Sequence, residues 1–152
     1  MILDNIDRKI LSLLQNDGKL QNNELAQMVG LSASPCLRRV KLLEDAGIIK
    51  KYVALLDAEK IGKGLTIFTR VWLLGQDIET VEKFSNIMRN HPQVVECHLM
   101  AGDCDFLLRV VSADLNEYRK FQIEYLTRTN GVQSIKTEIP MQNIKLTSEL
   151  PL

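Results

Sequence analysis

The sequence predicts an α+β protein: an N-terminal winged helix-turn-helix domain in residues 1–60 and a C-terminal ferredoxin-like βαββαβ domain in residues 61–152. Two observations lead to this prediction. Apolar residues recur at helical spacing in the first fifty positions, interrupted by glycines. From about residue 64 the pattern changes to alternation, and strand-like and helix-like segments then follow in the order β-α-β-β-α-β.

The composition is that of a soluble, globular chain. Of its 152 residues, 19 are Lys or Arg and 19 are Asp or Glu, and 45% are hydrophobic, which argues against disorder. No apolar run is long enough to span a bilayer, and the first residues lack the order of a secretory signal, so we expect a cytoplasmic protein without a membrane partner. The three cysteines form no CxxC pair, which favours reduced thiols over disulfides or a zinc site.

Two helices are predicted in residues 4–30. Asp4 is placed to cap the first, which carries apolar residues at helical spacing and should end near Gly18. Asn22 or Asn23 can cap the second, which should end at Gly30.

A third helix is predicted to follow at once. Ser32 or Ser34 can cap it, and Pro35 is tolerated in the first turn, where its missing amide has no helical partner. One face carries the apolar residues Cys36, Val40 and Leu43, and Gly47 should end the helix.

A short helix, a glycine turn and a serine-capped helix are the layout of a helix-turn-helix, whose second helix enters the DNA major groove. Residues 32–51 carry an excess of basic over acidic side chains on a chain of zero net charge. Ser34, Arg38 and Lys41 fall opposite the apolar face, where they would meet DNA. The alternative is a merely solvated charged surface. The segment IIKKYVALL then predicts a short strand or wing, from which Lys50 and Lys51 would reach phosphates.

Residues 65–141 predict the second domain. LTIFTRVWLL alternates as a strand, and an amphipathic helix follows and ends at NHP. VVECHLMAGDCDFLLRVVS predicts two strands joined at Gly102, Asp114 can cap a helix, and VQSIKTEIPM predicts a last strand. Both faces of the first strand look buried, with Phe68 and Trp72 on the second, which favours self-association through the sheet.

Three segments, in order and with matching lengths, resemble the Lrp/AsnC (leucine-responsive, or feast/famine) family of transcription factors. They are LDNIDRKILSLLQNDGK, NNELAQMVGLSASPCLRRVKLLEDAGIIKKY and VVECHLMAGDCDFLLRVV, and the resemblance covers nearly the whole chain. It implies an N-terminal helix-turn-helix, a linking strand, and a C-terminal domain that binds an amino-acid effector, dimerises and often assembles to octamers that bend DNA. The groove-facing helix of the family falls on residues 32–43, with Arg38, Arg39 and Lys41 as its basic contacts.

The same resemblance places the effector between dimers, around MAGDCD and near GVQSI. A free amino acid needs acceptors for its ammonium group and donors for its carboxylate; a glycine turn exposes amides, and Asp103 or Asp105 offers negative charge. An ordinary hairpin turn would contain the same residue types. Leucine or methionine would suit the apolar residues nearby. The expected effector residues are Leu99, Met100, Gly102, Asp103, Cys104, Asp105, Gln133, Ser134 and Ile135.

Other classes of function are less well supported by the sequence. Cys97 and His98 are neighbours on a predicted strand, so they point to opposite faces and do not readily share a metal ion. No motif pairs a nucleophile with a base, and no cofactor is expected, so we expect no catalytic residues. An architectural DNA-bending protein without an effector remains an open alternative.

Overall fold

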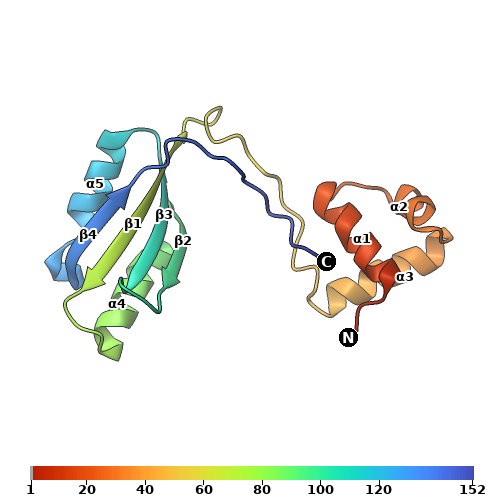
Figure 1. Ribbon diagram of the computed structural model, residues 1–152, viewed down its shortest axis with the longest axis horizontal. Helices are drawn as coiled ribbons and strands as arrows, with labels where there is room; N and C mark the ends of the chain where they lie inside the picture. Colours follow the sequence, from red (N-terminus) through yellow and green to blue (C-terminus); the bar gives the residue numbers. More distant parts are fainter. Residues whose placement is uncertain (1) are drawn as a thin grey trace. The chain divides into compact units, whose positions relative to one another are not determined.

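The computed structural model describes residues 2–152, which form two compact units (Figure 1). The first unit runs to Leu55 and also includes Ile144–Leu152, whereas the second comprises Leu56–Asn143. The division therefore differs from that expected from the sequence, which put the boundary at residue 60 and the last residues in the second domain. Among the described residues, no helix is both long and apolar enough to cross a membrane.

The first unit contains three helices, as predicted: α1 (Asn5–Asn16), α2 (Asn22–Val29) and α3 (Ala33–Asp45). The Asp4 cap is confirmed, because the Asp4 carboxylate accepts a hydrogen bond from the Asp7 amide at 2.8 Å. Asp7 completes a capping box by accepting from the Asp4 amide at 3.2 Å. These two bonds satisfy amides that the first turn of a helix leaves without partners.

The expected cap of α2 is wrong by one residue. The N-cap is Gln21, whose amide donates to the Glu24 carboxylate at 3.4 Å. Asn22 instead donates its side-chain amide to the Ala33 carbonyl at 2.8 Å, which ties the start of α2 to the start of α3. Gly30 ends α2 in the left-handed conformation with φ of +74°, as expected from its position.

Ser32 is the N-cap of α3, and the chain leaves this helix through Gly47, which has φ of +68°. The three helices share a core to which α1 contributes Ile10, α2 contributes Leu25, and α3 contributes Cys36 and Leu43. Cys36 and Leu43 have no exposed surface, so the predicted apolar face of α3 is confirmed. Burial also raises the pKa of the Cys36 thiol.

The segment after α3 does not form the predicted strand. Residues 51–57 are irregular and exposed, because a strand needs a partner backbone and none of residues 2–152 pairs with this segment. Tyr52 is nevertheless fixed, since its hydroxyl donates to the Glu44 carboxylate at 3.0 Å. Partial burial and this acidic neighbour raise the pKa of Tyr52 to about 12.

The second unit has the predicted βαββαβ order. Its elements are β1 (Leu65–Leu73), α4 (Ile78–Asn90), β2 (Val94–Leu99), β3 (Phe106–Ser112), α5 (Leu115–Tyr125), the short 3-10 helix η1 (Arg128–Asn130) and β4 (Val132–Glu138). The strands are antiparallel in the order β2-β3-β1-β4, and β4 therefore lies at an edge. The Asp114 cap of α5 is confirmed, because its carboxylate accepts from the Glu117 amide.

Both helices cover the same face of the sheet (Figure 1). Phe84 of α4 packs on Phe106 of β3, with ring centroids 4.8 Å apart, and both are buried. The Tyr118 hydroxyl lies 2.9 Å from that of Thr69 and 2.8 Å from that of Thr137, so α5 is also hydrogen-bonded to β1 and β4.

The other face of the sheet is only half-buried in the single chain, where the sequence suggested a buried surface. Phe68 and Trp72 lie on this face of β1, on either side of Arg70. The charged residues here are paired: Arg70 contacts Glu138 at 3.0 Å, and Arg109 contacts Glu96 at 2.8 Å. The result is a mixed apolar and ion-paired surface.

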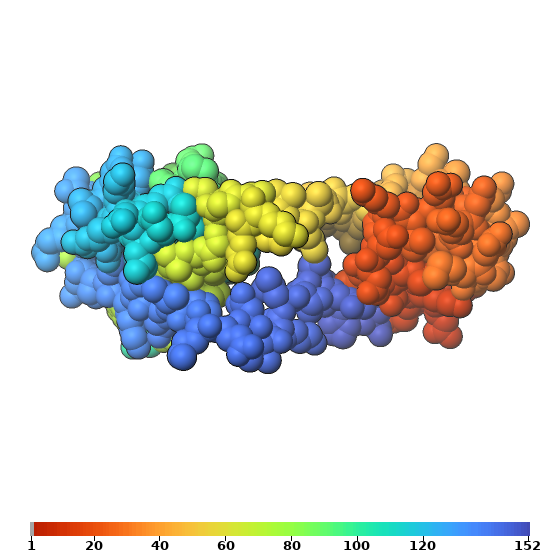
Figure 2. All heavy atoms as spheres, turned by 90° about the horizontal axis from the view of Figure 1, so that it is seen from above, coloured from red at the N-terminus to blue at the C-terminus, as the bar shows by residue number. Residues whose placement is uncertain are grey.

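The last residues of the chain pack on α1 (Figure 2). The Gln15 side chain donates to the Leu150 carbonyl at 3.0 Å and accepts from the Leu150 amide at 2.6 Å. The Gln15 side-chain amide thus satisfies both backbone polar groups of Leu150, and this fixes the position of Leu150 along α1.

His91 lies between the end of α4 and two rings of α5. Its centroid is 4.7 Å from that of Phe121 and 4.3 Å from that of Tyr125. Burial lowers the pKa of His91, although the Glu124 carboxylate opposes the shift. The folded unit therefore favours the neutral imidazole.

We expect the second unit to lose stability as the pH falls from 7.5 to 5.5. Below the ordinary value near 6.5 the unfolded chain protonates His91, whereas the folded chain does so only at lower pH; protonation therefore favours unfolding. Urea unfolding followed by the fluorescence of Trp72, the only tryptophan, measures this. His91→Gln should reduce the loss, and His98→Gln, which removes the other histidine, should retain it. Equal pH dependence in wild type and His91→Gln would contradict this origin.

Candidate functional site

The outward face of α3 is exposed and basic. Ser32, Ser34, Arg38 and Lys41 are all exposed, whereas Cys36 and Leu43 on the opposite face are buried. Neither Arg38 nor Lys41 forms an ion pair with any of residues 2–152. The structure thus brings together on one surface most of the side chains expected to contact DNA.

Arg39 differs from its neighbour Arg38. One of its guanidinium nitrogens lies 2.7 Å from both the Asp4 and the Asp7 carboxylates, and the Asp7 side chain is almost fully buried. The pKa of Asp4 is lowered, first by the Asp7 amide and then by Arg39, and the pKa of Arg39 is raised by both carboxylates. Arg39 therefore holds α3 against the start of α1, and its expected contact with DNA is not supported by this placement.

Lys50 and Lys51 follow the C-terminal turn of α3 and are exposed. No carboxylate of the described chain pairs with either side chain. Both ammonium groups are thus available to phosphates at the end of α3, although no strand positions them as the sequence suggested.

The turn between β2 and β3 contains most of the expected effector residues. Leu99, Met100, Gly102 and Asp103 are exposed, and Cys104 is buried. The Asp103 carboxylate has no hydrogen-bond or ion-pair partner among the described residues, so it is available to a cation.

Asp105 differs from Asp103, because its carboxylate is already hydrogen-bonded within the chain. Its carboxylate accepts from the Leu73 amide at 2.7 Å and from the Gln76 side chain at 2.8 Å. These bonds fasten the turn to the end of β1. The Asp105 carboxylate therefore holds the turn in the single chain, and its expected contact with an effector stays a prediction.

Trp72 connects the turn to the start of β4. Its indole N–H donates to the Asp103 carbonyl at 2.7 Å, and Trp72 lies opposite Ser134 in the pairing of β1 with β4. Trp72 therefore neighbours both expected parts of the effector site, the β2–β3 turn and the start of β4. They do not line a common cavity, because the groove that includes Gln133, Ser134 and Ile135 contains none of residues 99–105.

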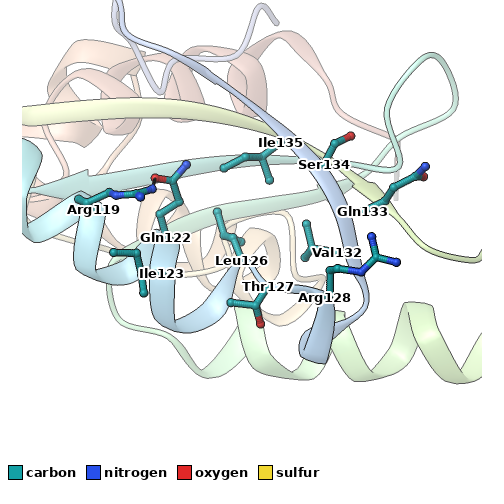
Figure 3. A pocket seen from close by; sticks show the side chains of 10 residues that line it. All are labelled: Arg119, Gln122, Ile123, Leu126, Thr127, Arg128, Val132, Gln133, Ser134 and Ile135. Atoms are coloured by element: carbon teal, nitrogen blue, oxygen red, sulfur yellow. Dashed lines mark hydrogen bonds between the residues drawn. The ribbon is translucent and has the colours of Figure 1, made fainter.

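That groove lies between α5, η1 and β4 and has a volume of about 300 Å³ (Figure 3). We refer to it as the α5–β4 groove. Its lining includes Arg119 and Arg128, which the sequence reasoning did not single out. No sequence motif marks either arginine as a groove residue, since Arg119 belongs to the polar face of a helix and Arg128 to a short turn.

Cys97 and His98 lie on opposite sides of β2. Cys97 pairs with the buried Leu108 and contributes to the helix-covered core, whereas exposed His98 lies 3.4 Å from the Glu96 carboxylate on the other side. Burial raises the pKa of the Cys97 thiol. Among the described residues, no group of three or more metal-ligating side chains is close enough to hold an ion.

Comparison with known proteins identifies the family. Residues 3–50 match a winged helix-turn-helix DNA-binding domain, and residues 66–150 match the Lrp/AsnC ligand binding domain. The chain belongs to the Lrp/AsnC family of transcriptional regulators. The resemblance seen in the sequence and the predicted two-domain fold are both confirmed.

Individual relatives match along nearly their whole lengths. The leucine-responsive regulatory protein of Rhizobium meliloti is 43% identical over 94% of this chain and 92% of its own, and that of Escherichia coli is 39% identical over 97% and 90%. A crystal structure of a Neisseria meningitidis transcriptional regulator in complex with L-Met is 41% identical, covers 99% of this chain and 97% of the other, and has a TM-score of 0.94. The chain is accordingly a DNA-binding transcriptional regulator with an amino-acid binding domain.

The adjacent arginines of α3 should respond differently to truncation. Arg39→Ala leaves the buried Asp7 carboxylate without its cation, so it should lower the melting temperature of the first unit by several degrees. Arg38→Ala removes an exposed side chain and should change the melting temperature little. Thermal unfolding followed by circular dichroism measures the melting temperatures of the two variants. Equal stability in both would show that the Arg39 pairs contribute nothing.

Proposed function

We propose that this regulator binds a specific double-stranded DNA site through the exposed face of α3 and responds to an amino acid, leucine or methionine, bound between dimers. The observation that carries the DNA-binding part is the contrast between the two faces of α3. Buried Cys36 and Leu43 fix the rotation of the helix, so Arg38 and Lys41 must face outward. A guanidinium can donate two hydrogen bonds to a guanine edge, whereas a lysine mainly neutralises phosphate.

The remaining contacts follow from position on the same surface. Ser32 and Ser34 at the N-terminus of α3 are placed to donate to phosphate, where the helix dipole also favours an anion. Lys50 and Lys51 extend the basic surface beyond the helix. We assign Arg39 a supporting role, because its guanidinium is occupied by Asp4 and Asp7.

We propose that two chains dimerise through the face of the sheet that α4 and α5 leave uncovered. These dimers would then assemble further, to an octamer. Phe68 and Trp72 leave apolar area on that face, and Arg70 and Arg109 are already neutralised by carboxylates, which lowers the cost of covering them. A dimer would present two copies of α3 roughly 34 Å apart, one turn of DNA.

The effector is proposed to bind at the β2–β3 turn. The relatives named leucine-responsive and the complex with L-Met concern other proteins, but both point to an apolar amino acid. In this chain the unpaired Asp103 carboxylate can hold the ammonium group, and exposed Leu99 and Met100 offer apolar contact. The alternative, an architectural DNA-bending protein, requires no ligand and predicts no response to amino acids.

Arg38→Ala should weaken specific DNA binding by about 1–3 kcal/mol, and Lys41→Ala should reduce the slope of log affinity against log salt by about one. Fluorescence anisotropy measures both, using a duplex selected from a random pool. Lys120→Ala is the matched control, because it removes an exposed cation from α5. If Arg38→Ala bound the duplex as tightly as Lys120→Ala does, Arg38 would not contact DNA.

A thermal-shift screen of the twenty amino acids tests the effector. A ligand at about 100 times its Kd stabilises the folded state by about 2.7 kcal/mol, and we expect leucine or methionine to do so. Asp103→Asn should abolish the shift and leave DNA affinity unchanged, because Asp103 is exposed and lies in the second unit. A full shift in Asp103→Asn would exclude this carboxylate, and no shift with any amino acid would favour the architectural protein.

A further inference from the structure

We propose that Leu37 of α3 contacts the 5-methyl group of a thymine in the major groove and thereby sets part of the sequence preference of this regulator. The inference rests on the proposed binding of DNA by the exposed face of α3, and it adds to that face a residue that reads a base without a hydrogen bond. Three features of Leu37 support this role: its exposure, its position among the residues proposed to face DNA, and its lack of any polar group.

Leu37 is not used to hold α3 in place. Its exposed fraction is 45%, whereas Cys36 beside it has no exposed surface. Within residues 2–152, Leu37 is neither in the core of the first unit nor among the side chains packed against that core. Single exposed leucines are common on protein surfaces, so exposure alone does not indicate a contact. It does leave the Leu37 side chain accessible to a partner molecule.

The position of Leu37 places it among the side chains proposed to face DNA. It follows Ser34 by three residues and precedes Lys41 by four, so the three side chains lie within about 60° of one another around the helix axis. Exposed Ala33 lies one turn before Leu37 and extends the apolar surface to the start of the helix. Leu37 is the fifth of the 13 residues of α3, in the N-terminal half, which is the part of a recognition helix that contacts base edges.

The chemistry of leucine restricts what it can recognise on a duplex. An aliphatic side chain placed against a phosphate or a polar base edge removes water from that group without replacing its hydrogen bonds. The 5-methyl group of thymine is the one apolar group that the base pairs of unmodified DNA present in the major groove. Leu37 therefore favours thymine, close to the base edge that the adjacent Arg38 can read by hydrogen bonds.

The charges around Leu37 favour DNA over a protein as the molecule that covers it. Arg38 and Lys41 are exposed, and neither forms an ion pair with any of residues 2–152. The centre of a protein interface is depleted of charged residues, whereas the phosphates of a duplex neutralise such cations. Leu42 is exposed to a similar extent, 50%, but it lies in the last turn of α3, outside the half that contacts base edges.

Replacement of single thymines by deoxyuridine tests the proposal, because it removes the 5-methyl group and keeps every hydrogen bond of the base pair. A duplex is selected from a random pool with the wild-type chain, and its affinity is measured by fluorescence anisotropy with each thymine replaced in turn. We expect one thymine in each half-site whose replacement weakens wild-type binding about fourfold, the amount that burial of one methyl-sized group supplies. Leu37→Ala should bind the unmodified duplex more weakly by about fourfold or more, and it should not respond to that replacement.

Leu42→Ala is the matched control, because it truncates an equally exposed leucine of the same helix, and it should respond to deoxyuridine as the wild type does. Leu37→Ala should keep the wild-type salt dependence, since it removes no phosphate contact. Circular dichroism verifies that both variants are folded.

The proposal is overturned if no replacement of a thymine weakens wild-type binding, or if the critical replacement weakens Leu37→Ala as much as the wild type. Arg38→Ala distinguishes this failure from a failure of the proposed function. If Arg38→Ala binds weakly and no methyl group matters, only the role of Leu37 is lost. If Arg38→Ala and Lys41→Ala both bind as the wild type does, α3 does not face DNA, and the role of Leu37 is lost with it.

Discussion

The orientation of α3 depends on the burial of one of its faces. Cys36 and Leu43 have no exposed surface, and they share a core with Ile10 of α1 and Leu25 of α2. Because a helix is rigid, burying these side chains determines where every other side chain of α3 points. Arg39 adds a second constraint by connecting α3 to the capping box of α1. The basic face is therefore a product of packing rather than of charge alone.

Local patterns were sufficient to predict the five α-helices of residues 2–152 and the βαββαβ order of the second unit, whereas long-range contacts decided the roles of individual residues. Apolar periodicity and the Asp4 and Asp114 caps gave the helices and their order, because these signals lie within a few residues of their effect. Arg38 and Arg39 looked equivalent in the sequence, since the partners of Arg39 lie more than thirty residues away. The strand expected after α3 needs a partner backbone, which no local pattern specifies.

The candidate effector site shows the same limit. The turn at Gly102 was predictable from its residues, but the use of the Asp105 carboxylate to fasten that turn to Leu73 was not. Trp72, which joins the turn to β4, was recognised only as an apolar strand residue. The α5–β4 groove arises where a helix meets an edge strand, and such a surface exists only after both have packed.

The last residues of the chain, which pack on α1, belong to the first unit. Because Ile144–Leu152 belongs to the first unit, the second unit is inserted into the chain of the first, and the backbone passes between them twice. Leu150 is hydrogen-bonded to the Gln15 side chain through both its amide and its carbonyl, so shortening the chain at this end removes partners from α1. Such a truncation would therefore affect the helical unit, although the deleted residues follow the second unit in the sequence.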